Sequence, residues 1–263
     1  MPEHATPLPG LNAALDDSLP WDGLARQYNF RHPTERGPIF ARLVREECAK
    51  RAKPVRVLDI GCGKGIERDI GLTRTIRPFV DDYWGIEPDP SITPEPGLFD
   101  HFQHALMETA TLPENAFDVS YSFLVMEHVK EPRPFLTAVA RSLKPGGTHM
   151  FGTINGAHYF AKIAGAMRAM RIDEFVLRAV RGKSEVEGYH YPVFYRVNTP
   201  RVIDRLAEDL GFHKPEYVYL EQLGPVPYFP GPLRPVLNML NWKRDKVRKP
   251  DSLLIVFCKM TKK

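Results

Sequence analysis

The stretch VRVLDIGCGKGIERD, residues 55–69, joins an apolar, β-branched run to a turn that contains three glycines. Such a run is typical of a strand buried on both faces, as in parallel sheets. Asp59 precedes the turn, and Gly61, Gly63 and Gly65 let the backbone take positive φ and approach a ligand closely. The first strand-to-helix turn of a parallel sheet is where such folds bind nucleotides. The stretch therefore predicts a nucleotide or anion site, with a simple structural turn as the alternative.

Two common glycine motifs do not fit this turn. A P-loop needs a longer glycine frame followed by Lys-Ser or Lys-Thr, and GCGKGIE lacks it. A dinucleotide fingerprint needs G-x-G-x-x-G, whereas the glycines here follow G-x-G-x-G. The short glycine frame therefore argues against a P-loop and weakens a dehydrogenase interpretation.

The rest of the chain alternates expected strands with expected helices. After the strand at 55–60, further strands are expected at 83–88, 100–104, 117–125, 148–154, 216–222 and 252–260. Helices are expected at 21–30, 34–52, 132–147 and 199–212, and residues 155–187 are also expected to be helical. This alternation predicts an α/β fold with a seven-stranded, mostly parallel sheet and helices on both faces.

Composition limits the class of protein. The chain has 263 residues, 43% of them hydrophobic, which suits one large domain with a packed core. Its net charge of +4 permits anionic partners without indicating any. The N-terminus lacks the pattern of a signal peptide, and no apolar run reaches the roughly 20 residues of a membrane span, so we expect a cytoplasmic protein. Cys48, Cys62 and Cys258 are too far apart for a zinc site or a disulfide framework, so no structural metal is expected.

An acidic residue at the end of the second strand strengthens the nucleotide interpretation. Glu87 stands where a carboxylate can accept both hydroxyls of a ribose, and Pro88 bends the chain there. VLDIGCGKG resembles the first motif of class I S-adenosylmethionine-dependent methyltransferases, and WGIEPDP resembles their acidic second motif. FDVSYSFLVMEHVKEPRPFLTAVARSLKPGG is similar to their fourth-strand motif and the helix that follows. The resemblance covers about residues 36–154 and implies a Rossmann-like fold with S-adenosyl-L-methionine as cofactor.

The resemblance also implies roles for individual residues. The glycine turn would hold the methionine end of the cofactor, Glu87 its ribose and Pro88 its adenine side. In ETATLP, Glu108 stands where the family often has an aspartate that reaches the adenine, and the backbone at Thr109 would assist it. Ser122 and Phe123, which leave the fourth strand, would hold the cofactor's amino group through their backbone, and His128 would pack near the cofactor. The expected cofactor residues are Asp59, Gly61, Cys62, Gly63, Glu87, Pro88, Glu108, Thr109, Ser122, Phe123 and His128.

Methyl transfer to a hydroxyl usually also needs a base, and histidine titrates in the appropriate range. His128, His158 and His190 are the candidates, and Tyr28 is a further one. We favour His190, which lies in GYHYPVFYR where an acceptor lid would return to the sheet. The alternatives are a structural role for His128 and simple packing of a tyrosine-rich loop around His190.

The chain is expected to divide into an N-terminal arm with a cap helix, residues 1–35, and a methyltransferase domain, residues 36–263. Insertions at 155–198 and 222–250 would form an acceptor lid. Their aromatic and aliphatic content favours a small hydrophobic or lipid-linked acceptor and O-methylation, by a monomer or homodimer. The basic cluster KRDKVRK, 243–249, permits RNA as an alternative acceptor, although nucleic acid is less favoured. The same cluster, with the segment 225–249, would also suit peripheral membrane contact. A cofactor-binding protein without turnover is the remaining alternative.

Overall fold

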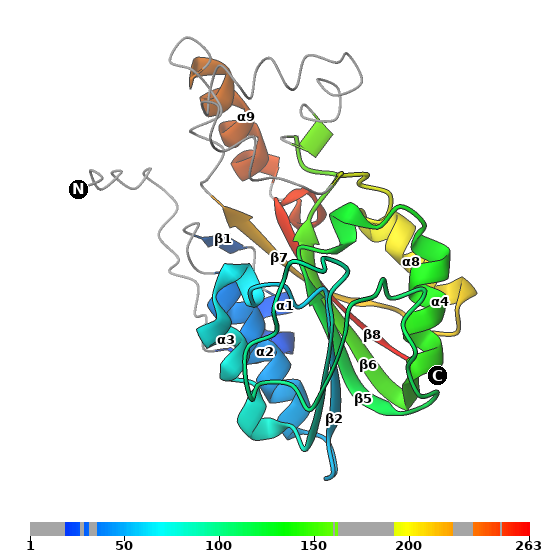
Figure 1. The fold of residues 1–263 in the computed structure, drawn as a ribbon. Helices are drawn as coiled ribbons and strands as arrows, with labels where there is room; N and C mark the ends of the chain where they lie inside the picture. Colours follow the sequence, from blue (N-terminus) through cyan, green and yellow to red (C-terminus); the bar gives the residue numbers. More distant parts are fainter. Residues whose placement is uncertain are drawn as a thin grey trace, which may run out of the picture.

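The fold is a single mixed sheet with helices packed on its two faces (Figure 1). It is seen in a computed structural model, which describes residues 19–26, 29–31, 36–159, 161–162, 192–222, 234–247 and 249–263. The strands are β1 (Asn29–Arg31), β2 (Arg56–Ile60), β3 (Asp82–Ile86), β4 (His101–Gln103), β5 (Phe117–Phe123), β6 (Leu143–Ile154), β7 (Glu216–Gln222) and β8 (Ile255–Thr261). Their order across the sheet is β1-β7-β8-β6-β5-β2-β3-β4.

The predicted seven-stranded, mostly parallel sheet is confirmed, with one addition. β8 runs antiparallel to both of its neighbours, β6 and β7, and the other pairings are parallel. The addition is β1, which pairs with β7 at the edge of the sheet. β2 pairs with β3 on one side and with β5 on the other, so the strand order reverses beside β2. Open sheets bind ligands outside the carboxyl ends of the strands at such a reversal.

Helices cover both faces of the sheet and enclose two apolar clusters (Figure 1). The helices α1 (Trp21–Ala25), α2 (Arg36–Ala49) and α3 (Ile70–Arg74) lie on one face, and α4 (Pro132–Ser142) and α8 (Pro200–Asp209) on the other. A further helix, α9 (Arg234–Val247), lies beyond the arrowheads of β6 and β7. None of the helices in the described ranges is both long and apolar enough to cross a bilayer.

Burial along α2 follows helical spacing and confirms the helix expected within 34–52. Ile39, Phe40, Leu43, Val44 and Cys48 are each no more than 2% exposed. Burying a large aliphatic or aromatic side chain contributes about 1.5–3 kcal/mol, so this stripe fixes α2 against the sheet. Because α2 precedes β2 directly, its packing also fixes the direction in which β2 enters the sheet.

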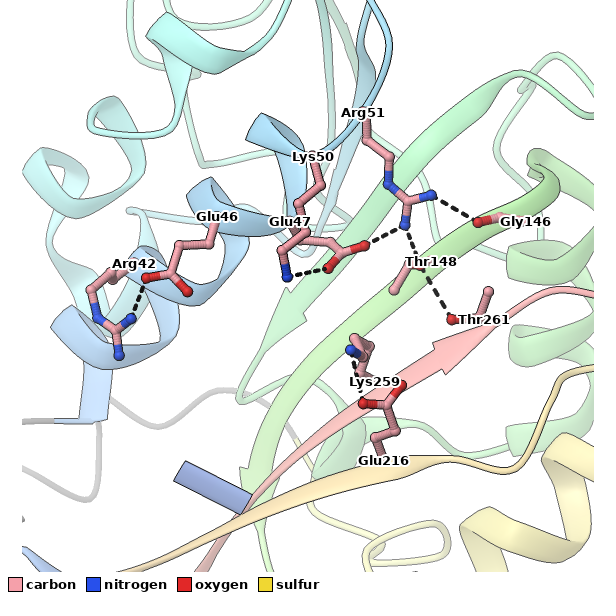
Figure 2. A network of polar contacts seen from close by, with 10 residues as sticks. All are labelled: Arg42, Glu46, Glu47, Lys50, Arg51, Gly146, Thr148, Glu216, Lys259 and Thr261. Carbon is pink, nitrogen blue, oxygen red and sulfur yellow. Dashed lines mark hydrogen bonds and ion pairs between the residues drawn. The ribbon is translucent and has the colours of Figure 1, made fainter. Parts of the chain in front are cut away.

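Polar contacts tie the end of α2 to the start of β6 (Figure 2). The Arg51 guanidinium donates to a carboxylate oxygen of Glu47, to the Gly146 carbonyl at 2.9 Å and to the Thr148 hydroxyl. Thr148 in turn contacts Thr261 of β8, with their hydroxyl oxygens 3.4 Å apart. This cluster lies at the amino ends of the parallel strands, and so at the opposite edge of the sheet from the glycine turn.

Two of the expected helices end five residues before the predicted position. The helix expected over 21–30 ends at Ala25, and β1 follows it at Asn29–Arg31. α1 and β1 therefore join the sheet domain, although both fall within the arm expected at 1–35. The helix expected over 132–147 ends at Ser142, because Leu143 is extended and the residue before Pro145 is biased away from helical geometry.

Candidate functional site

The glycine turn after β2 is held in place from both sides. The Gly61 and Cys62 amides both donate to the Ile86 carbonyl, at 2.8 and 3.1 Å, which ties the turn to the end of β3. Gly61 has φ +68°, and a Cβ there would lie 2.6 Å from a methyl carbon of Val125. Glycine at 61 therefore allows the turn after β2 and the turn after β5 to approach each other closely. Cys62 is buried, and burial raises the pKa of its thiol, so it packs as a neutral side chain.

Glu87 links the glycine turn to the end of β3. One oxygen of its carboxylate accepts from the Gly63 amide at 2.9 Å, and the other accepts from the Asp89 amide at 3.0 Å. A carboxylate has about four acceptor positions, so these two bonds leave capacity for two hydroxyl groups. Gly63 has φ +43°, and a Cβ there would come within 3.5 Å of Glu87 Oε2. The acid and the turn predicted to act together therefore lie in direct contact, while Pro88 is exposed beside them.

Asp59 ends a buried chain of hydroxyl groups. Tyr121 donates to Asp59 Oδ2 at 2.6 Å, and the hydroxyls of Tyr83 and Tyr121 contact each other. Because the Tyr121 hydrogen is used on Asp59, Tyr83 is the donor in the second contact. Burial raises the pKa of Asp59 to about 7, the Tyr121 hydrogen bond opposes this rise, and the Glu87 charge adds to it. Asp59 is thus a carboxyl group whose charge changes near neutral pH.

The expected adenine segment follows β4 and lies next to Glu87. The Ala105 amide donates to the Glu87 carbonyl at 3.2 Å, and Glu108 is half-buried in the turn that follows. The Thr109 amide donates to the Leu106 carbonyl at 3.0 Å, so this N–H is already used within the turn. Leu106, two positions before Glu108, is 55% exposed.

The end of β5 brings Ser122 and Phe123 to the middle of the sheet. Ser122 is fully buried, and among the described residues its hydroxyl has no hydrogen-bond partner. The Phe123 ring packs on Phe40 of α2, with centroids 5.0 Å apart, and lies where Gly152 has no Cβ. Ser122 and Phe123 were expected to hold the cofactor's amino group through their backbone, and this role stays a prediction.

Glu127 was missed by sequence reasoning, although it lies in the stretch that is similar to the fourth-strand motif of the family. It is 4% exposed and lies in the short helix η3 (Met126–His128) after β5. Its carboxylate accepts from the Thr153 hydroxyl at 2.8 Å, and its carbonyl accepts from the Phe194 and Tyr195 amides. Asn198 also donates to the Thr153 hydroxyl. Burial raises the pKa of Glu127. Through these hydrogen bonds, Glu127 joins the ends of β5 and β6 to the segment before α8.

The structure describes two of the four candidates for the base. His128 Nδ1 lies 3.1 Å from the Pro192 carbonyl, and because a carbonyl only accepts, Nδ1 carries the hydrogen. His158 is fully buried after β6, and its Nε2 lies 3.5 Å from a carboxylate oxygen of Glu221 at the end of β7. Tyr28 and His190 lie outside the described residues, as do most of the expected insertion 155–198 and residues 223–233 of the other expected insertion.

Comparison with known proteins decides the family. Residues 30–213 match the family described as a methyltransferase domain, which is more than half of the chain. The chain belongs to the class I S-adenosylmethionine-dependent methyltransferases. Two solved structures share the fold of this methyltransferase at low identity. One is a SAM dependent methyltransferase from Archaeoglobus fulgidus, with 15% identity and a TM-score of 0.51 over 85% of this chain and 93% of that chain. The other is the YcgJ protein from Bacillus subtilis, with 16% identity and a TM-score of 0.51 over 85% of this chain and 97% of that chain.

Curated relatives of this methyltransferase are named ubiquinone biosynthesis O-methyltransferases. The protein of that name from Roseobacter denitrificans is 31% identical over 128 residues, which are 45% of this chain and 50% of that protein. The chain spans about half the length of the curated relatives it matches.

The site of this methyltransferase fits S-adenosylmethionine. Glu87 has acceptor capacity for the two ribose hydroxyls, and Asp59 offers a carboxylate for the ammonium group beside the glycine-rich turn. The cofactor supplies an activated methyl group on a sulfonium when it is bound. The protein's part is to align the acceptor with that group and to exclude water, and alignment alone can lower a barrier by roughly 7–11 kcal/mol.

Proposed function

We propose that this methyltransferase transfers the methyl group to an oxygen atom of a small, hydrophobic, lipid-linked acceptor. The observation that carries the proposal is the similarity, at 30–32% identity, to relatives named ubiquinone biosynthesis O-methyltransferase. That name gives an oxygen acceptor and a place in ubiquinone biosynthesis for the relatives. Their similarity supports the same class of acceptor for this chain.

The composition of the two insertions supports an apolar acceptor. Residues 155–198 and 222–250 are rich in aromatic and aliphatic side chains, and they follow β6 and β7 at the carboxyl edge that also carries the cofactor site. Phe151, in β6 just before the first insertion, is fully buried in the core cluster between the sheet and α4 and α8. It therefore contributes to packing rather than to acceptor binding.

A histidine is the proposed base for the acceptor hydroxyl. His190 stays the favoured residue from the sequence, and among the other sequence candidates His158 gains support because a carboxylate oxygen of Glu221 lies beside its ring. A carboxylate orients an imidazole and stabilises the charged form that results when it takes up a proton. Substitution of the base should lower kcat by about 10²–10⁴-fold and remove the acidic limb of the pH–rate profile.

The experiment is a transfer assay with S-adenosylmethionine labelled in its methyl group. Extracts are fractionated into lipid-soluble, water-soluble and RNA pools, and each pool is incubated with wild type and with Glu87→Ala. We expect label in the lipid-soluble pool, retained after mild alkali because methyl ethers survive where methyl esters are hydrolysed. Label confined to RNA would contradict the acceptor class. Cofactor binding without label in any pool would indicate a binding protein instead.

The base is then assigned by comparing His190→Ala, His158→Ala and His128→Ala on the labelled acceptor. A loss of kcat with an unchanged affinity for S-adenosylhomocysteine identifies the base. Equal kcat for all three variants would contradict the assignment of a histidine. Glu221→Gln is the matched test of His158, because it keeps the shape of the side chain and removes the charge beside the ring.

A further inference from the structure

The helix α9 presents one side to the domain. Asn241 Oδ1 accepts a hydrogen bond from the Tyr159 hydroxyl at 2.9 Å, so Asn241 marks the side of α9 that faces the segment after β6. α9 lies beyond the arrowheads of β6 and β7, at the same edge of the sheet as the glycine turn (Figure 1). Its outer side therefore faces away from the domain at the edge where ligands enter.

The outer side of α9 is apolar. Four exposed hydrophobic side chains of α9 are Val236 (45% exposed), Met239 (58%), Trp242 (61%) and Val247 (62%). At about 100° per residue, each of them lies about 100–160° around the helix axis from Asn241, in one direction or the other. They make up four of the seven large hydrophobic side chains found exposed in the described ranges. Exposed apolar side chains gathered on one helix face indicate a surface that contacts something other than water.

Lysines lie among these apolar side chains. Lys243 and Lys246 are exposed and project from the same outer side, and the Lys246 Nζ lies 5.0 Å from the centroid of the Trp242 ring. Residues 243–249 carry five basic residues and one acidic residue. The outer face is thus both apolar and positively charged.

We propose that the outer face of α9 (Val236, Met239, Trp242, Val247, Lys243 and Lys246) binds the surface of an anionic lipid bilayer. Helices with this combination lie in the interface, with apolar side chains at the headgroup boundary and lysines on the lipid phosphates. Cores of protein interfaces are depleted in lysine, so the interspersed lysines favour a bilayer over a protein partner. Binding would hold the ligand edge of the sheet towards the membrane. The inference goes beyond methyl transfer and does not depend on the acceptor.

The test is co-sedimentation of the full chain with vesicles. Binding is compared between vesicles of phosphatidylcholine alone and vesicles that contain 30% phosphatidylglycerol, at low and high salt. We expect salt-sensitive binding that requires the anionic lipid. Each basic residue near such a surface strengthens binding about fivefold, so Lys243→Gln/Lys246→Gln/Lys249→Gln should weaken it about 100-fold. Equal binding to both vesicle types, or none, would overturn the proposal.

The matched control removes the same charge from the opposite edge of the sheet. Lys53, Lys214 and Lys263 are exposed and precede β2, precede β7 and follow β8, respectively, at the amino ends of the parallel strands. Lys53→Gln/Lys214→Gln/Lys263→Gln should bind as wild type does, and equal weakening in both triple variants would overturn the role of α9. Far-UV circular dichroism and Tm show that each variant is folded.

Insertion of the apolar face has its own readout. Trp242 emission should be quenched by lipids brominated in the upper part of the acyl chain, and the quenching should disappear in Trp242→Phe. Met239→Ser should weaken vesicle binding at every salt concentration. If Met239→Ser instead dissociates a homodimer and leaves vesicle binding unchanged, the apolar face is an interface between copies of the chain and the proposal fails.

Discussion

The affinity of this methyltransferase for its cofactor should rise with pH, and Asp59 is the reason. The carboxyl group has a pKa of about 7, raised by burial, and it can balance the ligand's ammonium group only when it is charged. The charged fraction of a group with that pKa increases from about 9% at pH 6 to about 91% at pH 8. The association constant for S-adenosylhomocysteine should therefore increase about tenfold over this range.

Tyr121→Phe should move this dependence to higher pH. The Tyr121 hydroxyl donates to Asp59 Oδ2 at 2.6 Å and opposes the rise in pKa. A hydrogen bond to a charged group is worth about 1.5–3 kcal/mol, which corresponds to about 1–2 pKa units. The midpoint should thus move to about pH 8–9, and at pH 7 the affinity should fall about 5- to 50-fold.

Isothermal titration with S-adenosylhomocysteine from pH 5.5 to 8.5 measures both effects. The ligand's own titration is the same for both proteins and cancels in the ratio of their affinities. Tyr83→Phe is the control, because Tyr83 contacts Tyr121 and no hydrogen bond joins it to Asp59, so its shift should be smaller. If wild-type affinity does not change with pH, or if Tyr121→Phe and wild type have the same midpoint, the reasoning is refuted.

Three further substitutions test other parts of the structure. Glu87→Ala should lower the affinity for S-adenosylhomocysteine more than 100-fold, because two hydrogen bonds to a charged group are lost at about 1.5–3 kcal/mol each. Calorimetric titration measures this, with Glu95→Ala as the control, and equal affinities of the two variants would contradict the prediction. Arg51→Ala should lower the free energy of unfolding by about 1–3 kcal/mol in urea while leaving cofactor affinity unchanged, since its contacts lie at the opposite edge of the sheet. Glu127→Gln keeps the acceptor for Thr153 and replaces a carboxyl group whose pKa is raised by burial. Because the unfolded chain loses this proton at lower pH than the folded chain does, wild type should lose stability relative to the variant as pH rises. Tm measured from pH 5 to 8.5 checks the sign, and a variant that becomes relatively less stable with pH would contradict it.

The central strands and the cofactor turn were predictable because local patterns specify them. The run before Asp59 indicated a buried strand, and the three glycines and Glu87 indicated a ligand at its end. The structure adds that Gly63 and Glu87 are joined directly by a hydrogen bond. β1 could not be predicted, because a strand of three residues is too short to show a periodic pattern.

Contacts between distant segments could not be predicted from any local pattern. Asp59 and Tyr121 lie directly opposite each other in the register of β2 and β5, which depends on the order of the strands. Glu127 meets Thr153, and Thr153 meets Asn198, only because three separate segments come together at the same edge of the sheet. A buried acid in a polar sequence such as MEH gives no indication of its burial by itself.

The double tie of Glu87 to Gly63 and Asp89 has a consequence for turnover. Since both carboxylate oxygens already accept hydrogen bonds from backbone amides, the Glu87 charge stays hydrogen-bonded after S-adenosylhomocysteine leaves. Exchange of used donor for fresh donor then demands little rearrangement there. Whatever step limits the catalytic cycle should accordingly be sought at the opposite end, where the acceptor arrives and leaves.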